Sequence, residues 1–171
     1  MTDIVPKNAR GEIKFVTYKA NLDILTSWLK LHRAGFRKQY QKRWVNNIYF
    51  DSNGFDCFQA NVSGISSRAK VRYRWYGDFL RSKKGSVEIK RKRNFFGWKH
   101  HFIINNGPDV NRHSWVEIRN ILFAQTSIIG RSWLKSYPVP VIINRYLREY
   151  FVSHDKKVRV TIDNKEKLWD Q

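Results

Sequence analysis

The sequence predicts an α+β fold in which an antiparallel β-sheet carries two helices on its outside. Apolar and charged residues alternate in several short segments, as they do in half-buried strands. Two other segments repeat apolar residues at helical spacing, and clusters containing Gly, Asn or Pro separate the segments as turns do. The seven expected strands cover residues 10–18, 45–51, 68–76, 86–92, 98–104, 141–151 and 157–163.

The strand expected at residues 68–76 is the centre of this pattern. Its same-face neighbours would lie about 7 Å apart, so a row of like charges is tolerable toward solvent but costly toward an interior without anions. For one strand alone, a solvated sheet face is a sufficient explanation. The cations are Arg68, Lys70, Arg72 and Arg74, and the apolar residues between them are Ala69, Val71, Tyr73 and Trp75.

Three further segments repeat the charged row, and each places an acid among the bases. A surface that only had to be soluble would mix the two signs freely. A lining that holds a polyanion together with a divalent cation needs many bases and a few carboxylates. The repetition therefore favours such a lining. The rows are Arg10, Glu12 and Lys14; Glu88, Lys90 and Lys92; and Arg159, Thr161 and Asp163.

The helices are expected between these strands. Asn21 is a plausible N-cap for a first helix, and Leu22, Leu25 and Leu29 form its apolar stripe. A second helix is expected from Trp115 to about residue 124, and residues 55–62 are compatible with a short one. The basic segment 33–43 is expected to be a solvated connection, with steering of anions toward a binding site as the alternative for residues 38–43.

Composition limits the class of protein. The chain has 171 residues, of which 42% are hydrophobic and 15% aromatic, which indicates one folded domain. Lys and Arg number 33 against 14 Asp and Glu, a net charge of +19, so the expected partners are nucleic acid, polyphosphate, nucleotides or an anionic membrane.

The lone Cys57 excludes an internal disulfide and a zinc ribbon and is expected in the core. No apolar run reaches the roughly 18 residues of a membrane span, and the N-terminal residues lack the pattern of a signal peptide. We expect a cytoplasmic protein.

Six motifs, in order, resemble the VTC domain, the polyphosphate-polymerase branch of the triphosphate tunnel metalloenzymes. Any one of them is weak evidence, but six in sequence are collectively specific. They are Arg10-x-Glu12-x-Lys14, Ile48-Tyr49-Phe50-Asp51, Lys70-x-Arg72-x-Arg74-x-Tyr76-Gly77, Glu88-Ile89-Lys90-x-Lys92, Tyr146-x-Arg148-x-x-Phe151 and Arg159-x-Thr161-x-Asp163.

The resemblance implies a closed antiparallel β-tunnel that binds ATP or another nucleoside triphosphate together with polyphosphate or tripolyphosphate. It implies transfer of the γ-phosphoryl group to a growing polyphosphate chain, with carboxylates holding Mg²⁺ or Mn²⁺. Glu12 and Glu88 are the candidate carboxylates, for metal or for orienting lysines. The phosphate ligands implied by motif position are Lys14, Arg72, Arg74, Lys90, Arg148 and Arg159, to which Lys99 and Lys70 are added.

Relatives of this kind continue past the Thr-x-Asp strand into a strand that supplies a metal-binding glutamate, and then into a closing helix. We therefore expect residues 1–171 to be a single domain that is incomplete at its C-terminus and lacks the final strand. The resemblance does not assure activity of this piece alone.

Other functions stay open. A metal-dependent inorganic triphosphatase needs the same lining, and a polyphosphate-binding regulator needs no catalysis. A nucleic-acid-binding module would suit the charge, but Tyr73 and Trp75 are expected on the face opposite Arg72 and Arg74, whereas stacking platforms keep both kinds of group together. The adjacent residues 100 and 101 are both histidine, and they would point to opposite faces of a strand, which makes a poor metal pair.

Overall fold

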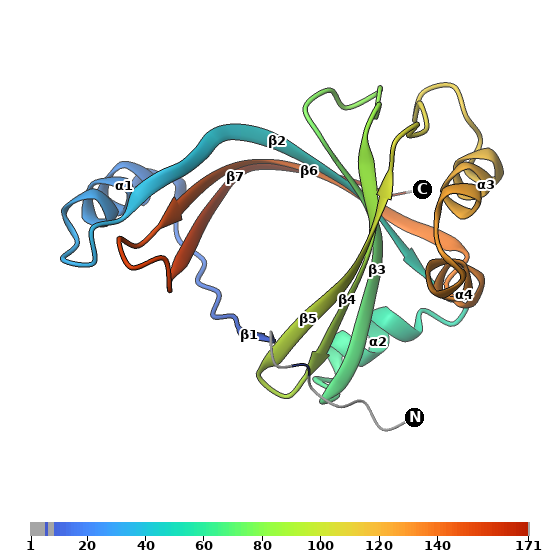
Figure 1. Ribbon diagram of the computed structural model, residues 1–171, viewed down its shortest axis with the longest axis horizontal. Helices are drawn as coiled ribbons and strands as arrows, with labels where there is room; N and C mark the ends of the chain where they lie inside the picture. The colour runs from blue at the N-terminus through green and yellow to red at the C-terminus, as the bar shows by residue number, and fades with distance from the viewer. Residues whose placement is uncertain (1–5, 7–8, 171) are drawn as a thin grey trace.

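The structure is a computed structural model that describes residue 6 and residues 9–170. Its centre is a seven-stranded antiparallel sheet with the order β1-β5-β4-β3-β2-β6-β7. The sheet is strongly curved (Figure 1). The strands are β1 (Arg10–Gly11), β2 (Arg37–Asp51), β3 (Ser67–Tyr76), β4 (Gly85–Arg93), β5 (Phe96–Ile104), β6 (Val139–Val152) and β7 (Arg159–Trp169).

The helices lie outside this curve, with α2, α3 and α4 near β3 to β5 and α1 at the far end of β6 and β7 (Figure 1). None of the helices in the described part of the chain is long and apolar enough to cross a membrane. The predicted α+β class with an antiparallel sheet is confirmed. The helical elements are η1 (Lys19–Asn21), α1 (Leu22–Leu31), α2 (Asp56–Val62), α3 (Trp115–Gln125) and α4 (Ile128–Ser136).

The main core lies between the sheet and the helices α3 and α4. Val71, Tyr73 and Trp75 of β3 are fully buried there, and the alternating cations of β3 point the other way. The three buried side chains of β3 pack with Leu122 of α3 and Leu134 of α4. We call the side of the sheet that faces away from this core the inner face. It carries the residues in phase with Lys70, Arg72, Arg74 and Tyr76 of β3.

A second, smaller core fixes the outer end of the sheet. Leu29 of α1 packs with Phe151 of β6 and Ile162 of β7. Leu22 and Leu25, from the predicted apolar stripe, pack against the same cluster. The first helix therefore covers the sheet on its outside, as expected.

Over the residues that the structure describes, the sheet does not close into a complete tunnel. β1 and β7 are its two edges, so the implied closed β-tunnel is wrong in that respect and barrel-like describes only the curvature. The first expected strand, residues 10–18, is also too long, because only Arg10 and Gly11 are paired, with Gly97 and Phe96. Phe96 begins β5, so the residues after Gly11 run past the end of their partner.

The segment 33–43 is not the expected connection. Most of it belongs to β2, which pairs with β6 from Arg37 onward, whereas β3 pairs only with the second half, from Val45. The first half of β2 pairs with β6 alone and its cations are exposed. Its amino-acid composition therefore resembles that of a loop. Two register shifts near Tyr40 add to its irregular pattern.

The helix α4 was not expected from the sequence. Gly130 lies inside it and weakens the helical signal. An added Cβ there would lie 2.8 Å from the Cβ of Thr126 and 3.2 Å from a ring carbon of Phe102, so close packing requires the glycine. With α2 and α4, the structure has four α-helices in its described part, where two were expected.

Candidate functional site

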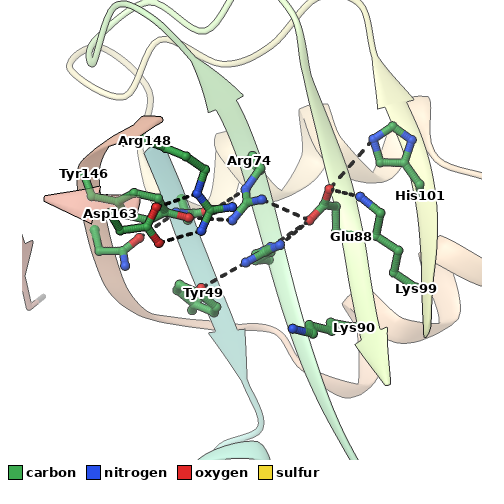
Figure 2. A network of polar contacts seen from close by, with 12 residues as sticks. Tyr49, Arg74, Glu88, Lys90, Lys99, His101, Tyr146, Arg148 and Asp163 are labelled. Carbon is green, nitrogen blue, oxygen red and sulfur yellow. Dashed lines mark hydrogen bonds and ion pairs between the residues drawn. The ribbon is translucent and has the colours of Figure 1, made fainter. Parts of the chain in front are cut away.

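The buried carboxylate of Glu88 lies at the centre of the inner face. Its side chain is 2% exposed and accepts hydrogen bonds from Arg72 Nε at 2.8 Å and from Lys99 Nζ at 2.8 Å. Arg74 Nη1 and His101 Nε2 each lie 3.9 Å from its oxygens. Figure 2 shows how these groups from β3, β4 and β5 turn toward one another. One acid therefore holds several cations side by side.

The cations determine the charge state of this acid. Burial alone would raise the pKa of the Glu88 carboxyl, but the opposing effects of Arg72, Arg74 and Lys99 lower the pKa to about 2. Glu88 is therefore ionised at neutral pH. Its charge offsets the repulsion among the basic side chains around it.

A chain of hydrogen bonds crosses the sheet from β3 to β7 through Arg74. The Arg74 side chain is nearly buried, and it donates from Nε to Asn47 Oδ1 at 2.7 Å and from Nη2 to the Tyr146 hydroxyl at 2.9 Å. Asn47 Nδ2 donates to Asn144 Oδ1 at 2.6 Å, and Asn144 Nδ2 donates to Glu166 Oε1 at 3.2 Å. These bonds fix the Arg74 guanidinium in one orientation.

Arg72 is held in a similar way. Its Nη1 donates to the hydroxyl of Tyr49 at 3.2 Å, on the side opposite Glu88. Burial would raise the pKa of the Tyr49 hydroxyl, yet the charge and hydrogen bond of Arg72, together with the charges of Arg74 and Lys70, lower it below its ordinary value. Tyr49 belongs to a motif noted in the sequence, but its role at the site was not predicted.

Arg148 continues the row on β6. It forms two parallel bonds with Asp163 of β7, each 2.6 Å long, and its guanidinium lies 5.0 Å from the centre of the Tyr146 ring. Burial opposes the charged form, but the hydrogen bond to Asp163 and the charges of Asp163 and the nearby tyrosines together raise the pKa of Arg148. Figure 2 shows Arg148, Tyr146 and Asp163 adjoining Arg74.

Lysines form the other end of the row. Lys90 is paired with Glu12, and Glu12 is about half exposed. Partial burial lowers the pKa of the Lys70 ammonium. The nearby Tyr49 raises this pKa, and the positive charges of Lys14 and Lys90 lower it further. The expected ligands Lys14, Lys70 and Lys90 are therefore close enough to repel one another, and an anion placed among them would relieve that repulsion.

Arg159 is the one predicted phosphate ligand that the structure places apart from the others. It is exposed and lines a hollow with Arg37, Lys38 and Lys156 at the outer end of the sheet. Its pairing position on β6 is four residues from Arg148, which is about 13 Å along the strand.

Several polar residues of the site were missed by sequence reasoning. Asn47, Asn144 and Glu166 have ordinary surface chemistry, and only the register between distant strands brings them to Arg74. Glu166 lies in the part of β7 beyond the expected end at residue 163. His101, considered in the sequence only as half of a poor metal pair, lies on the inner face with its Nε2 3.9 Å from Glu88. The period-2 pattern was the signal that could have placed His101 there.

The comparison of this sequence with protein families gives a match that covers almost the whole described chain. The family model of the VTC domain matches residues 9–170. The chain belongs to the VTC domain family. A comparison with curated proteins gave no match. The match to this VTC domain confirms the resemblance carried by the six motifs, and it continues to residue 170, beyond the last motif at Asp163.

The inner face of this VTC domain combines arginines in fixed positions with exposed lysines. Its arginines are fixed by hydrogen bonds to Glu88, Tyr49, Asn47 and Tyr146, while Lys70 and Lys99 remain exposed. Guanidinium groups suit paired contacts with phosphate oxygens, and lysines act as mobile point charges. No three His, Cys, Asp or Glu side chains of the described residues gather as a metal site would require.

Proposed function

We propose that the inner face binds a nucleoside triphosphate and polyphosphate, and that the domain transfers the γ-phosphoryl group to the polyphosphate chain. The observation that carries this proposal is the row of cations from three strands, β3, β5 and β6, that adjoins one buried acid, Glu88. Arg72 and Lys99 contact that acid directly, and Arg74 and Arg148 extend the row.

Phosphoryl transfer asks a protein mainly to position its reactants and to neutralise charge, so it requires no nucleophilic side chain. In the proposed reaction a terminal phosphate oxygen of the chain attacks the γ-phosphorus. The bond between that phosphorus and the β-γ bridging oxygen breaks, and the nucleoside diphosphate leaves. Arg72 and Arg74 would bind non-bridging phosphate oxygens. Lys90 and Lys99 would neutralise the negative charge of the γ-phosphoryl group as it is transferred.

We propose that Mg²⁺ or Mn²⁺ enters this site bound to the phosphates. Both oxygens of Glu88 are engaged by Arg72 and Lys99, so we propose that Glu88 orients these cations. The donor set does not fit a metal held by the protein alone. Mg²⁺ commonly binds one or two carboxylates together with substrate phosphates, and the partly exposed Glu12 is the candidate carboxylate.

A metal-dependent triphosphatase is the second candidate function. Lys70, Lys99 and His101 are exposed and the sheet is open at its edges, which would admit water as the attacking group. Incubation with ATP and short polyphosphate separates the two reactions. A transferase lengthens the chain in proportion to the ADP formed, whereas a triphosphatase releases inorganic phosphate, from ATP or from the chain itself, and never lengthens the chain.

The binding part of the proposal is tested by calorimetry with tripolyphosphate. Replacing Arg72 and Arg74 together by Ala should abolish measurable binding, because charged hydrogen bonds of this kind contribute about 1.5–3 kcal/mol each. Replacing Arg33, an exposed arginine between α1 and β2, by Ala should change nothing.

Because Arg74 is buried, a second variant guards against loss of folding. Lys70→Ala with Lys90→Ala removes less buried charges and should weaken binding about tenfold or more. Unchanged tripolyphosphate affinity in both double variants would refute the assignment of these residues as ligands.

A further inference from the structure

A cluster of tyrosines surrounds an arginine at one end of the phosphate row. The guanidinium of Arg43 lies 4.0 Å from the ring centre of Tyr76, 4.9 Å from that of Tyr150 and 5.4 Å from that of Tyr40. Arg43 Nε also donates to the hydroxyl of Tyr150 at 3.2 Å. We call these four residues the Arg43 cluster.

The Arg43 cluster directly adjoins the proposed phosphate ligands. Tyr76 is the next residue of the inner face after Arg72 and Arg74 on β3, so it lies one same-face step of about 7 Å beyond Arg74. Arg43 is the pairing partner of Arg148 on β6. The cluster and the phosphate row therefore form one continuous surface, with aromatic rings at one end and lysines at the other.

The two tyrosines at the margin of this cluster are open to solvent. Tyr40 is 52% exposed and Tyr76 is 42% exposed, although both contact Arg43. By contrast, Tyr73 and Trp75 on the other face are completely buried. Tyr73 and Trp75 therefore lie away from the cations, as the sequence predicted. Tyr40 and Tyr76 are different aromatic residues, and their exposed rings offer a stacking surface beside the cations.

We propose that the Arg43 cluster binds the base of the nucleoside triphosphate, an inference that rests on the proposed function. The base would stack on Tyr40 and Tyr76, and Arg43 would hold these rings in place. The same-face step of about 7 Å from Tyr76 to Arg74 is long enough for the ribose and the α-phosphate. The α-phosphate would then lie near Arg74 and Arg148. Stacking does not depend on which base is present, so the site accepts purine nucleotides without choosing among them.

This arrangement gives the nucleotide a direction. With the base at Tyr76, the γ-phosphate points along the row toward Lys90 and Lys99, which are opposite one another on β4 and β5. The nucleoside end is then distant from the point of transfer. The polyphosphate chain approaches from the lysine end of the inner face.

Calorimetry on the whole chain tests the inference by comparing ATP, GTP and tripolyphosphate. Tyr40→Leu with Tyr76→Leu should weaken both nucleotides about tenfold, because a stacked base contributes that much or more. Tripolyphosphate has no base and should retain its affinity within about twofold. Tyr40→Phe with Tyr76→Phe keeps the rings and should bind like the unaltered protein. Phe95→Leu, at an aromatic residue that is 84% exposed between β4 and β5, should change nothing.

A second measurement does not depend on the stability of a variant. Photo-crosslinking with 8-azido-ATP should label the peptides that contain Tyr40 or Tyr76, and excess ATP should prevent the labelling. Labelling confined to other peptides would overturn the inference.

The remaining outcomes separate the inference from the function beneath it. The cluster is not a base site if the leucine variant binds ATP with normal affinity. The same conclusion follows if its affinities for tripolyphosphate and for ATP fall by the same factor. In both cases the proposed function still stands. If the unaltered protein binds a single-stranded oligonucleotide more tightly than ATP through the same tyrosines, the ligand is nucleic acid and the inference is wrong. Failure of the unaltered protein to bind tripolyphosphate would contradict the proposed function itself.

Discussion

Glu88 is the residue on which the inner face depends. It contacts Arg72 and Lys99 directly, and Arg74 lies 3.9 Å away, so the acid compensates charges that would otherwise repel one another. A bound phosphate would share these cations with Glu88. The same carboxylate therefore stabilises this group of cations and, in the proposed function, would compete with a bound phosphate for them.

Glu88→Gln should lower the free energy of unfolding at pH 7 by on the order of 3 kcal/mol. The folded pKa of about 2 lies below the ordinary value of 4.5, so the carboxylate contributes stability above about pH 4.5, and this is lost as the pH falls toward 2. Urea unfolding of both proteins at pH 7, 4 and 3 measures the difference. A gap that stayed constant over this range would contradict the role given to ionised Glu88.

Sequence alternation was sufficient to place the principal cations. Arg72 and Arg74 lie opposite Tyr73 and Trp75, as the period-2 pattern requires. Their partners could not be predicted in the same way, because Asn47 is 27 residues from Arg74 along the chain and Tyr146 is 72 residues away. Only the register of β2 and β6 decides which polar groups reach them.

Among the elements, the end of β2 shows how a family motif can serve structure. The carboxylate of Asp51 accepts hydrogen bonds from the backbone N–H groups of Ser52 and Cys57 at 2.8 Å and of Phe58 at 2.9 Å. The N–H groups of Cys57 and Phe58 lie in the first turn of α2, where backbone donors have no acceptor within the helix. Asp51 therefore joins the central sheet to this short helix, although it lies in a motif suggestive of function.

Asp51→Ala should reduce the free energy of unfolding by about 2 kcal/mol, because buried backbone donors at α2 lose their acceptor. Asp51→Asn keeps one acceptor oxygen and should cost less. Asp56→Ala, which removes an exposed carboxylate from the first turn of the same helix, should cost less than about 1 kcal/mol. Chemical denaturation at pH 7 provides the comparison, and equal losses for Asp51→Ala and Asp56→Ala would count against this capping role.

The elements that sequence reasoning misjudged share a physical cause. The alternating residues 12–18 have strand composition but lie beyond the end of β5, and α4 contains a glycine that packing requires. In each case the local pattern is overridden by a neighbour that the sequence does not reveal. The central strands β3 and β4 agreed with their predicted bounds to within one residue at each end, whereas β2 begins eight residues before its predicted start.

At the scale of the whole molecule, residues 12–18 connect the two ends of the sheet. This segment leaves β1 beside β5 and reaches α1, which packs on β6 and β7 (Figure 1). Its side chains are exposed, and Glu12 meets Lys90 of β4. The segment therefore passes close to the lysine end of the proposed site.

Limited digestion with trypsin should show whether this segment responds to ligand. Cleavage after Lys14 and Lys19 is expected early, because these residues lie outside the sheet and are exposed. Tripolyphosphate should slow cleavage after Lys14, since the proposed site includes that side chain. Cleavage after Lys84, in the exposed connection between β3 and β4, is the control and should be unaffected. Equal rates at Lys14 with and without tripolyphosphate would exclude it from the site.

The strict alternation of β3 has a consequence for how such a sequence can change over time. Inserting or deleting a single residue within the strand would exchange its two sets of side chains, turning Val71, Tyr73 and Trp75 toward solvent and the arginines into the core. Changes in the length of this strand should therefore survive selection only in steps of two residues, or at its ends.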